Sequence, residues 1–587
     1  MKFTGAELII HLLERQGVRT IAGIPGGALL PLYEALGRSS RMVHVLARHE
    51  QAAGFIAQGM ARMTGKPGVC FATSGPGVTN VITALADAKL DSVPLVCIAG
   101  QVPQHLIGTD AFQEVPTLAM VQPITKASFF VREPRELLEV IPEAFRIAAS
   151  GRPGPVLIDV PKDVQTQIVD DPFGPAGNVC APASSSICSQ TDPHSGTPQA
   201  FDTAWQMIAQ ARQPVLYVGG GVVKSRSHAL VRELAELAQI PVTTTLMALG
   251  TLPPQHPLNL GMLGMHAARY TNRVLDECDL LIAVGARFDD RATGKPQDFA
   301  SRARVIHIDI DPREFGKIRQ PQLAIAADAA TALHELMSRA HYQHRPHWLA
   351  RVRELRKALP LQMPGSDALC SPYGIVRAVG EFAPADAIVT TDVGQHQMWV
   401  AQAYPFRRPD RWLTSGGLGT MGFGLPAAIG AALAQPQATA LCFTGDGSLL
   451  MNIQELATLA ELDLNVKIIV LDNGALGLVR QQQTLFYSKR LVASHFAQPS
   501  NFIAIAQAFG IPAVSLDESA AARDTLAQVL RSDGPALIRV PIHADHHVLP
   551  MVAPGAANIH AIDHEAEMTG TVARQPRFEA HATDRLE

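Results

Sequence analysis

The chain has 587 residues, of which 47% are hydrophobic and 17% charged, with a formal net charge of −4 at neutral pH. This length exceeds what one hydrophobic core supports and predicts about three domains. The composition is that of an ordinary α/β enzyme and excludes a disordered or fibrous protein. With 49 basic against 53 acidic residues and no basic block, no nucleic acid or anionic membrane surface is expected as a partner.

The cysteines and the amino-terminal sequence bear on the compartment. Seven cysteines are present without a C-x-x-C pair, and most lie in apolar strand-like runs, as free thiols do in a reducing compartment. The start, MKFTGAELII, runs directly into an amphipathic helix pattern, and no apolar stretch reaches the roughly 18 residues of a membrane span. We therefore expect a cytoplasmic protein with no membrane partner.

Strand and helix patterns alternate through residues 1–165. Short apolar and β-branched runs predict strands, each followed by a glycine-rich or proline-marked turn, at 42–47, 68–73, 94–100 and 155–160. This alternation is typical of a doubly wound parallel sheet. The next segment, 166–197, is rich in Pro, Ser, Gly and Asp without a period and is predicted to be a linker.

Two further α/β blocks follow. The second block, 198–345, has predicted strands at 214–223, 279–290 and 303–312. A polar helical connection, 346–369, leads to the third block, 370–553, with predicted strands at 387–394, 439–447, 466–473 and 535–542. The polar, aperiodic segment 554–587 is predicted to be mostly a mobile tail. The expected fold class is α/β, with three doubly wound parallel-sheet domains.

The stretch GDGSLLMNIQELATLAELDLNVKIIVLDN, residues 445–473, carries the clearest chemical signal. It reads as strand, helix, strand, and such a crossover makes both strands parallel, so Asp446 and Asn473 leave the carboxyl ends of strands at one edge of the sheet. Two hard oxygen ligands there suit Mg²⁺, and the small Gly445 and Gly447 permit close approach of a phosphate. A Gly-Asp-Gly alone is more often a simple turn, so the metal hypothesis depends on the later Asp-Asn.

Seven further motifs follow in order along the chain: RHEQAAGFIAQGMAR, ATSGPGVTN, IGTDAFQE, SGRPGPVLIDVPKD, GARFDDR, TTDVGQHQMW and SGGLGTMGFGLPAAIG. Together with the Gly-Asp-Gly unit, they resemble the catalytic large subunits of acetolactate synthase, also called acetohydroxyacid synthase, a family of thiamine diphosphate enzymes. The resemblance covers about residues 1–557, and GMAR and QQQ resemble the isozyme I type of enteric bacteria. It implies a pyrimidine-binding first domain, a central FAD-binding domain and a diphosphate- and Mg²⁺-binding third domain.

The resemblance also implies a reaction and partners. Pyruvate is decarboxylated on thiamine diphosphate, and its two-carbon fragment is joined to a second pyruvate or to 2-oxobutyrate, in branched-chain amino acid biosynthesis. A homodimer or larger assembly and a small regulatory subunit are expected. The alternative is a related thiamine diphosphate and FAD pyruvate oxidase or 2-oxoacid decarboxylase. A non-catalytic nucleotide-binding protein would be expected to lack Glu50 or Asp446, and both are present.

The family positions assign roles to residues that pattern alone leaves open. Glu50 reads as an acidic helix-start residue, but the resemblance makes it the glutamate that hydrogen-bonds the aminopyrimidine ring of the cofactor and directs proton transfer. The Mg²⁺ ligands are Asp446, Asn473 and the carbonyl of Ala475. The remaining implied thiamine diphosphate contacts are Gln395, His396, Gly419, Met421, Gly445, Gly447 and Ser448. Without the family, His396 reads as a capped turn and Met421 as packing.

Other matched positions lie at the reacting carbon and the substrate pocket. Gly27, Gln113 and Lys162 match positions where a developing oxyanion needs donors, although Gln113 and Lys162 read equally as solvated loop residues. Arg291 matches the arginine that takes the carboxylate of the second 2-oxoacid; the alternative is a surface pair with an aspartate of its own loop. The implied pocket lining is Phe112, Met265, Val393 and Gln482. Gln482 departs from the tryptophan of most members, which puts acceptor preference in doubt.

The middle block contains no full G-x-G-x-x-G, so its pattern alone is weak evidence for a dinucleotide. The resemblance implies FAD at Arg152, Gly220, Gly221, His266, Arg287, Asp309 and Asp328. FAD-free fermentative members of the family lack the RFDD segment, so its presence here indicates the flavin-containing biosynthetic branch.

Overall fold

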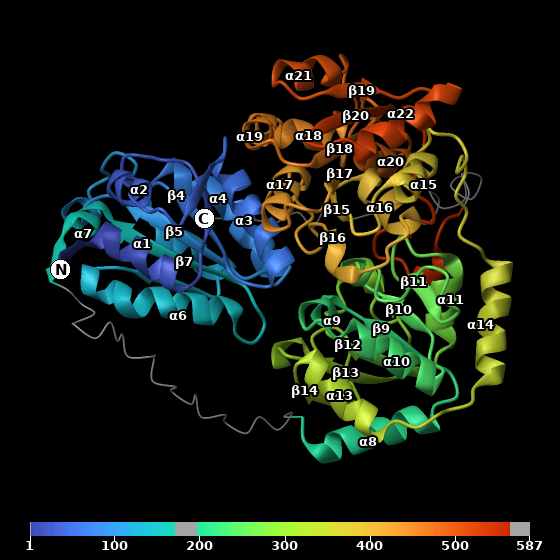
Figure 1. Cartoon of the computed structure of the whole chain (residues 1–587). Coiled ribbons are helices and arrows are strands. Elements are labelled where there is room, and N and C mark those ends of the chain that lie inside the picture. Colours follow the sequence, from blue (N-terminus) through green and yellow to red (C-terminus); the bar gives the residue numbers. More distant parts are fainter. Residues whose placement is uncertain (1, 171–195, 564–587) are drawn as a thin grey trace, which may run out of the picture.

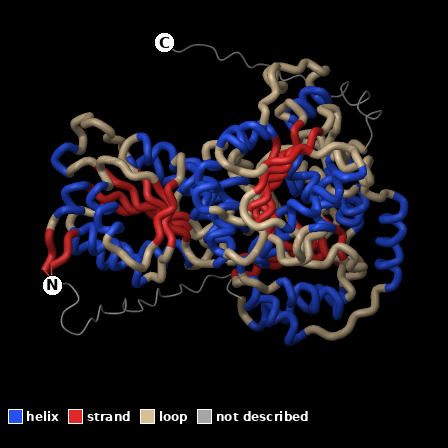
Figure 2. The backbone as a smooth tube through the Cα atoms, turned by 45° about the horizontal axis from the view of Figure 1, so that its top comes forward, coloured by secondary structure: helices blue, strands red, loops and turns tan. Residues whose placement is uncertain are grey.

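The computed structural model describes residues 2–170 and 196–563. It contains three six-stranded parallel sheets, which confirms the predicted fold class. Figure 1 shows the first domain, in blue, beside the third, in orange and red, with the central domain in green below the third. In each domain helices cover the strands, as Figure 2 shows by colour.

The first sheet has the strand order β3-β2-β4-β5-β7-β6. Its strands are β2 (Thr20–Gly23), β3 (Val43–Leu46), β4 (Gly68–Ala72), β5 (Leu95–Gln101), β6 (Ala127–Phe130) and β7 (Pro155–Pro161). Its helices are α1 (Gly5–Arg15), α2 (Leu30–Gly37), α3 (Glu50–Thr64), α4 (Pro76–Leu90), α5 (Thr117–Val121), α6 (Leu137–Ala149) and α7 (Lys162–Thr166).

The central sheet has the order β11-β10-β9-β12-β13-β14. Its strands are β9 (Pro214–Val218), β10 (Val242–Thr244), β11 (Asn259–Met262), β12 (Leu280–Val284), β13 (Arg304–Asp309) and β14 (Leu323–Ala326). The helices are α8 (Pro198–Gln210), α9 (Gly220–Lys224), α10 (His228–Ala238), α11 (Arg269–Glu277), α12 (Asp290–Thr293), α13 (Ala329–Arg339) and, in the connection, α14 (Pro346–Ala358).

The third sheet has the order β16-β15-β17-β18-β20-β19. Its strands are β15 (Ile388–Thr391), β16 (Trp412–Leu413), β17 (Ala440–Gly445), β18 (Val466–Asp472), β19 (Ala513–Ser515) and β20 (Ala536–Pro541). The helices are α15 (Pro372–Phe382), α16 (Gln395–Ala403), α17 (Gly424–Ala434), α18 (Asp446–Leu449), α19 (Glu455–Leu462), α20 (Gly477–Phe486), α21 (Phe502–Ala508) and α22 (Ala520–Arg531).

Helices α3 and α17 join the first and third domains through one shared core. A Cβ on Gly59 would lie 2.3 Å from the carbonyl oxygen of Ala427, and one on Gly430 would lie 2.0 Å from that of Ile56. Glycines at these two positions therefore let the helix backbones touch. The rings of Phe55 and Phe423 pack edge-on beside the crossing, 5.3 Å apart.

Several sequence expectations differ from the structure, among them the predicted strand 279–290, which ends at Val284. Strand β8 (Ile168–Asp170) falls in the predicted linker and pairs antiparallel with β1 (Lys2–Thr4); residues 171–195 of that linker lie outside the described residues. The predicted strand 214–223 ends at Val218, because the glycines that follow open helix α9.

The first ten residues of the segment predicted to be mostly a mobile tail, 554–563, pack against the central domain. The Asn558 side chain donates to the carbonyl of Ala292 at 2.8 Å, and Asp563 pairs with Arg269 at 2.8 Å. Residues 564–587 lie outside the described part of the chain. Across the described ranges, no helix combines the length and the apolar character that crossing a membrane requires.

Candidate functional site

Asp446 and Asn473 meet at the carboxyl ends of the neighbouring strands β17 and β18. The backbone N–H of Ala475 donates to Oδ2 of Asp446 at 3.1 Å and to Oδ1 of Asn473 at 3.1 Å. Burial raises the pKa of the Asp446 carboxyl to about 7, because desolvation disfavours its charged form. One carboxylate, one amide oxygen and the nearby Ala475 carbonyl form a donor set that suits Mg²⁺. Among the described residues, no group of three His, Cys, Asp or Glu side chains forms a metal cluster, and this donor set contains only one of those types.

A small cleft of about 60 Å³ opens over these residues. It brings together the predicted metal ligands and Val393, which was predicted to line the substrate pocket. It also contains all the predicted thiamine diphosphate contacts of the third domain except Gly419, namely Gln395, His396, Met421, Gly445, Gly447 and Ser448. A Cβ on Gly447 would lie 2.6 Å from the end of the Leu476 side chain, so a larger residue here would have to displace that side chain. The cleft therefore has the cradle that a diphosphate needs.

His396 and Gln395 begin helix α16 at the edge of the cleft. Burial lowers the pKa of His396 to about 3, so its ring is neutral, and its Nε2 has no hydrogen-bond partner among the described residues. Gln395 is held by Gln481 and by the carbonyl of His546, each at 2.9 Å, and accepts from Asn473 Nδ2 at 3.3 Å. A buried, unpaired ring nitrogen beside an anion cradle is the polar group that a phosphate would satisfy.

The loop from Thr414 to Met421 supplies the predicted cofactor supports Gly419 and Met421. Gly419 has φ +70°, a left-handed conformation that favours glycine. The loop is held from the far side by Asp392, whose carboxylate accepts from the backbone N–H of Gly422 at 2.8 Å and of Gly424 at 3.0 Å. Asp392 was not among the predicted site residues, although TTDVG places an acidic residue directly after a strand.

Glu50 is the first residue of α3, at the carboxyl edge of the first sheet. Its Oε2 accepts a hydrogen bond from Asn80 Nδ2 at 2.9 Å, a partner that the sequence analysis did not single out. Glu50 is not among the residues that line the Asp446 cleft; those belong to the third domain. A single chain thus presents the two predicted halves of the site on different domains.

Gly27, Gln113 and Lys162 lie in segments that follow strands β2, β5 and β7 of the same sheet. Gln113 has φ +63°, and its Cα would lie 2.8 Å from a Cβ on Gly75, so the two segments are in close contact. A non-glycine residue in this conformation is a strained position of the kind found in functional loops. The neighbouring Phe112 is 87% exposed, so no pocket of this chain encloses it.

Met265 and Arg291 lie together in the central domain. Arg291 Nη1 is 3.7 Å from the sulfur of Met265, and the two backbones are joined by a hydrogen bond of 2.9 Å. The Arg291 side chain is 63% exposed, with a loose pair to Asp290 at 3.8 Å, so its guanidinium is available to a carboxylate. Gln482 is half-buried on α20 and does not line the Asp446 cleft.

A cavity of about 400 Å³ lies between the first and central domains. Six of the seven predicted flavin contacts line it: Arg152, Gly220, Gly221, Arg287, Asp309 and Asp328. Lys224, which the sequence analysis did not identify, also lines it, and desolvation lowers the pKa of Lys224 to about 8. The volume lies in the range of cofactor sites. Arg152, Lys224 and Arg287, with two adjacent glycines, offer donors to a dinucleotide diphosphate, and the carboxylates Asp91, Asp289, Asp309 and Asp328 line the same cavity.

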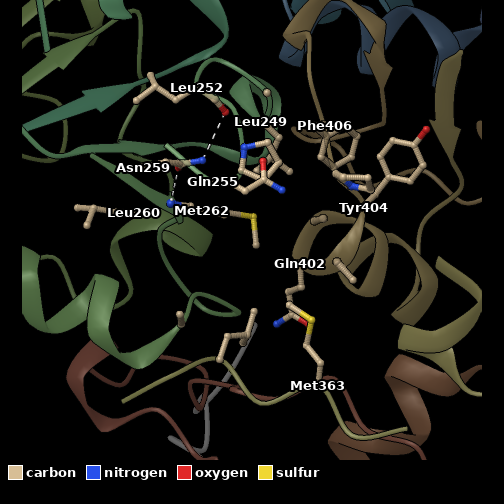
Figure 3. Close-up of a pocket in the computed structure, with 18 of the residues that line it drawn as sticks. Leu249, Leu252, Gln255, Asn259, Leu260, Met262, Met363, Gln402, Tyr404 and Phe406 are labelled. Carbon is tan, nitrogen blue, oxygen red and sulfur yellow. Dashed lines mark hydrogen bonds between the residues drawn. The ribbon is translucent and has the colours of Figure 1, made fainter. Parts of the chain in front are cut away.

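His266, the seventh predicted flavin contact, does not line that cavity. It lies instead at a third cavity of about 720 Å³, between the central and third domains (Figure 3). Figure 3 shows Gln402 and Met363 across from Met262 and Asn259. His266 is fixed there by its backbone carbonyl, which accepts from Gln402 Nε2 at 2.9 Å, and by its ring Nδ1, 3.1 Å from the carbonyl of Pro550.

Known families match all three domains. Thiamine pyrophosphate enzyme, N-terminal TPP binding domain, matches residues 3–120; the central domain of the same enzymes matches 201–336; and their C-terminal TPP binding domain matches 392–540. Among curated relatives, the acetolactate synthase isozyme 1 large subunit of Escherichia coli (strain K12) is 54% identical, covering 96% of this chain and 98% of the relative. The isozyme 2 large subunit of the same organism is 46% identical over 95% and 99% of the two chains, and acetolactate synthase 1, chloroplastic, of Zea mays 43% over 94% and 88%.

The fold, the diphosphate cradle and these matches define a thiamine diphosphate-dependent enzyme. Within that class, the chain belongs to the acetolactate synthase large-subunit family. The sequence resemblance is thereby confirmed, and acetolactate synthase is favoured over the oxidase and decarboxylase alternatives.

Proposed function

We propose that the chain forms 2-acetolactate from two pyruvate molecules and 2-aceto-2-hydroxybutyrate from pyruvate and 2-oxobutyrate, in the cytoplasm, as a step of branched-chain amino acid biosynthesis. The observation that carries the proposal is that Asp446 and Asn473 both accept a hydrogen bond from the backbone N–H of Ala475, inside a cleft that Gly445 and Gly447 also line. Bound thiamine diphosphate supplies the nucleophilic thiazolium carbon and the electron sink for decarboxylation. Asp446, Asn473 and the Ala475 carbonyl would hold Mg²⁺ on its diphosphate.

The side chains around the reacting carbon have separate roles. Glu50 would hold a proton at the aminopyrimidine ring, within the ordinary repertoire of general acid–base catalysis. Gly27, Gln113 and Lys162 would surround the developing oxyanion, and the Gln113 amide and Lys162 ammonium are donors. The fork of donors on Arg291 would take the acceptor carboxylate, while Met265, Phe112, Val393 and Gln482 would enclose its side chain.

We further propose FAD for the cavity lined by Arg152, Lys224 and Arg287. The net reaction has no redox step, so the flavin would act by binding alone and stabilise the folded chain by mass action. His266 would contact the flavin only if the cofactor extended beyond this cavity.

A dimer or larger assembly would place Glu50 of one chain over the Asp446 cleft of its partner. A small regulatory subunit is also proposed, because several relatives are named as large subunits.

The test is product analysis with the purified chain. With pyruvate, thiamine diphosphate, Mg²⁺ and FAD, acetolactate should form without oxygen uptake. Omission of Mg²⁺ or thiamine diphosphate should abolish the product, whereas reduced flavin should support much of the activity. Oxygen consumed in proportion to product, or acetaldehyde or acetate as the main product, would favour an oxidase or a decarboxylase.

A further inference from the structure

The loop from Thr414 to Met421 contacts both candidate cofactor cavities. At one end, a Cβ on Gly416 would lie 2.3 Å from the sulfur of Met247, a residue that lines the proposed flavin cavity. At the other end, Met421 lines the cleft over Asp446. One short connection between β16 and α17 therefore forms part of the surroundings of two separate sites.

Two buried aspartates of the first domain hold this loop. Asp87 Oδ2 accepts from the hydroxyl of Ser415 and, at 3.0 Å, from that of Thr420. Asp91 Oδ2 accepts from the N–H of Gly416 at 3.1 Å, and its Oδ1 from the N–H of Gly417 at 2.7 Å. Thr420 N–H closes the loop on Ser415 Oγ at 2.9 Å.

Arg62 of α3 pairs with both carboxylates. Its Nη2 is 2.8 Å from Asp91 and 3.5 Å from Asp87, and its Nη1 donates to the carbonyl of Thr414 at 3.2 Å. The three side chains are 10%, 1% and 0% exposed, in the order Arg62, Asp91, Asp87. Buried charges are costly unless their hydrogen-bonding capacity is used, and here the loop uses much of it.

Asp91 also reaches the flavin side. It lines the proposed flavin cavity together with Ser92, whose hydroxyl accepts from Arg152 Nε at 2.8 Å. Burial opposes ionisation of Asp91, but Arg62, Lys224 and backbone amides hold its pKa below the ordinary value. A ligand that fixes Met247 therefore acts on a side chain beside Gly416 of the loop. A ligand that binds Lys224 changes a charge that acts on Asp91, and one that binds Arg152 acts on the partner of the neighbouring Ser92.

We propose that Asp87 and Asp91 are positioning residues that couple the two cofactor sites, so that a dinucleotide in the Arg152 cavity fixes the Thr414–Met421 loop and tightens binding of thiamine diphosphate. The inference rests on the proposed function. This coupling would explain how a flavin that takes part in no redox step still contributes to the reaction. A ligand that orders a loop shared by two sites lowers the entropy cost of ordering that loop for the second ligand. Coupling of this kind is reciprocal, so thiamine diphosphate must tighten FAD equally.

The first test uses the unmodified full-length chain. Titration calorimetry measures the Kd of thiamine diphosphate with Mg²⁺ in FAD-free and FAD-loaded protein, and the Kd of FAD with and without thiamine diphosphate. We expect each ligand to tighten the other by the same factor, about 5- to 150-fold, the usual range of such coupling. Independent binding of both ligands would overturn the coupling and leave the proposed function intact. Failure of either ligand to bind would overturn both.

The second test removes the link from the loop side. Thr420→Val deletes the hydroxyl that donates to Asp87, and it should bring the coupling factor severalfold closer to one. The Kd of FAD alone should stay within about threefold of its normal value, since Thr420 does not line the flavin cavity. Thr420→Ser keeps a hydroxyl and should restore the coupling. The matched control is Thr439→Val, which deletes a partly buried hydroxyl at the amino end of β17. A full coupling factor in Thr420→Val, or equal losses in Thr420→Val and Thr439→Val, would contradict the role of Asp87.

Discussion

At the residue scale, we expect Gln482 to influence which 2-oxoacid, pyruvate or 2-oxobutyrate, is preferred as the acceptor. It is half-buried on α20, next to the fully buried Gln481, whose amide is tied to Val548. Preference for 2-oxobutyrate over pyruvate means recognising one methylene, a difference worth roughly 1–3 kcal/mol in an apolar pocket. An amide resists dehydration beside a methyl group. We expect weak preference in the natural chain, with acetolactate abundant when both acids are present at equal concentration.

Gln482→Trp should raise the ratio of acetohydroxybutyrate to acetolactate by about tenfold or more, because each 1.4 kcal/mol is a decade. A competition assay that counts both products measures the ratio. Gln482→Leu is the control, since it removes the amide without adding a broad flat surface, and it should give a smaller change. An unchanged ratio in the tryptophan variant would show that another residue sets the pocket.

The burial of His307 predicts the direction in which the stability of the fold changes with pH. It lies buried on β13 between the rings of Phe288 and Phe315, with Nε2 3.0 Å from the carbonyl of Ala286, and burial lowers its pKa to about 4. An unfolded histidine titrates near 6.5, so the unfolded chain takes up the proton first as the pH falls. The stability associated with the neutral ring is present above pH 6.5 and is lost on acidification toward pH 4.

The variant His307→Gln should therefore flatten the acid limb of the stability profile. The slope of unfolding free energy against pH should fall by up to one proton between pH 6.5 and 4, or roughly 1.4 kcal/mol per pH unit. Urea unfolding, followed by intrinsic fluorescence across that range, measures it. His266 and His396, whose pKa values burial also lowers, keep part of the slope in the variant. An identical slope would mean that His307 becomes protonated without unfolding.

At the element scale, the close packing of α3 against α17 depends on glycine residues, which have no side chain, at the point where the helices cross. Gly59→Ala would place a Cβ 2.3 Å from a backbone oxygen of α17, closer than any ordinary contact, so the helices must separate. We expect a loss of about 1–3 kcal/mol in unfolding free energy, typical of overpacking, and weaker cofactor binding because Glu50 begins the same helix. Thermal unfolding and titration calorimetry measure the two effects.

Gly37→Ala is the matched control for the crossing. Gly37 ends helix α2, and a Cβ there would meet nothing within 4 Å, so the change should be neutral or slightly stabilising. Equal losses in the two variants would contradict the prediction, because alanine is the better helix former and a loss at Gly37 could not come from contact between the helix backbones.

Elements differ in how well the sequence predicts them. Strands such as β4 and β18 are buried on both faces, so their continuous apolar runs are visible without a structure. The two-residue strand β16 is too short to show a period, and β8 lies in a segment whose composition indicates a loop. Residues 554–563 look like a tail, because their packing depends on hydrogen bonds such as that of Asn558 and not on an apolar pattern.

The residues of the site also differ in how well the sequence predicts their positions. Asp446 and Asn473 were predictable because strand ends fix where their side chains emerge, and this placement is confirmed. The bond of Ser415 to Asp87 joins residues 328 positions apart, and no local pattern predicts it. The cavity that His266 lines was not predictable, since a motif gives sequence order but not which of two adjoining cavities a side chain faces. The roles of Glu50, Arg291 and Gln482 stay predictions.

At the scale of the whole molecule, the separation of Glu50 from the Asp446 cleft decides how many chains make one site. Within one chain the Glu50 carboxylate binds Asn80, and the cleft is lined by the third domain. If a partner chain supplies Glu50, each site of a symmetric dimer uses the first domain of one chain and the third domain of the other. The two halves of a site can then be inactivated on different chains.

Mixing two inactive variants tests this arrangement. Glu50→Gln should lose about two to four decades of turnover, and Asp446→Ala should lose affinity for thiamine diphosphate and Mg²⁺ together. After the two are unfolded and refolded together, about half of the dimers are mixed, and each mixed dimer holds one site with both residues intact. Roughly a quarter of normal activity should therefore return. Asp446→Ala mixed with Asn473→Ala is the control, because both changes affect the same domain and no intact site can form. If Glu50 and Asp446 of one chain act together, every site in the first mixture carries a lesion, and activity stays at the level of the separate variants.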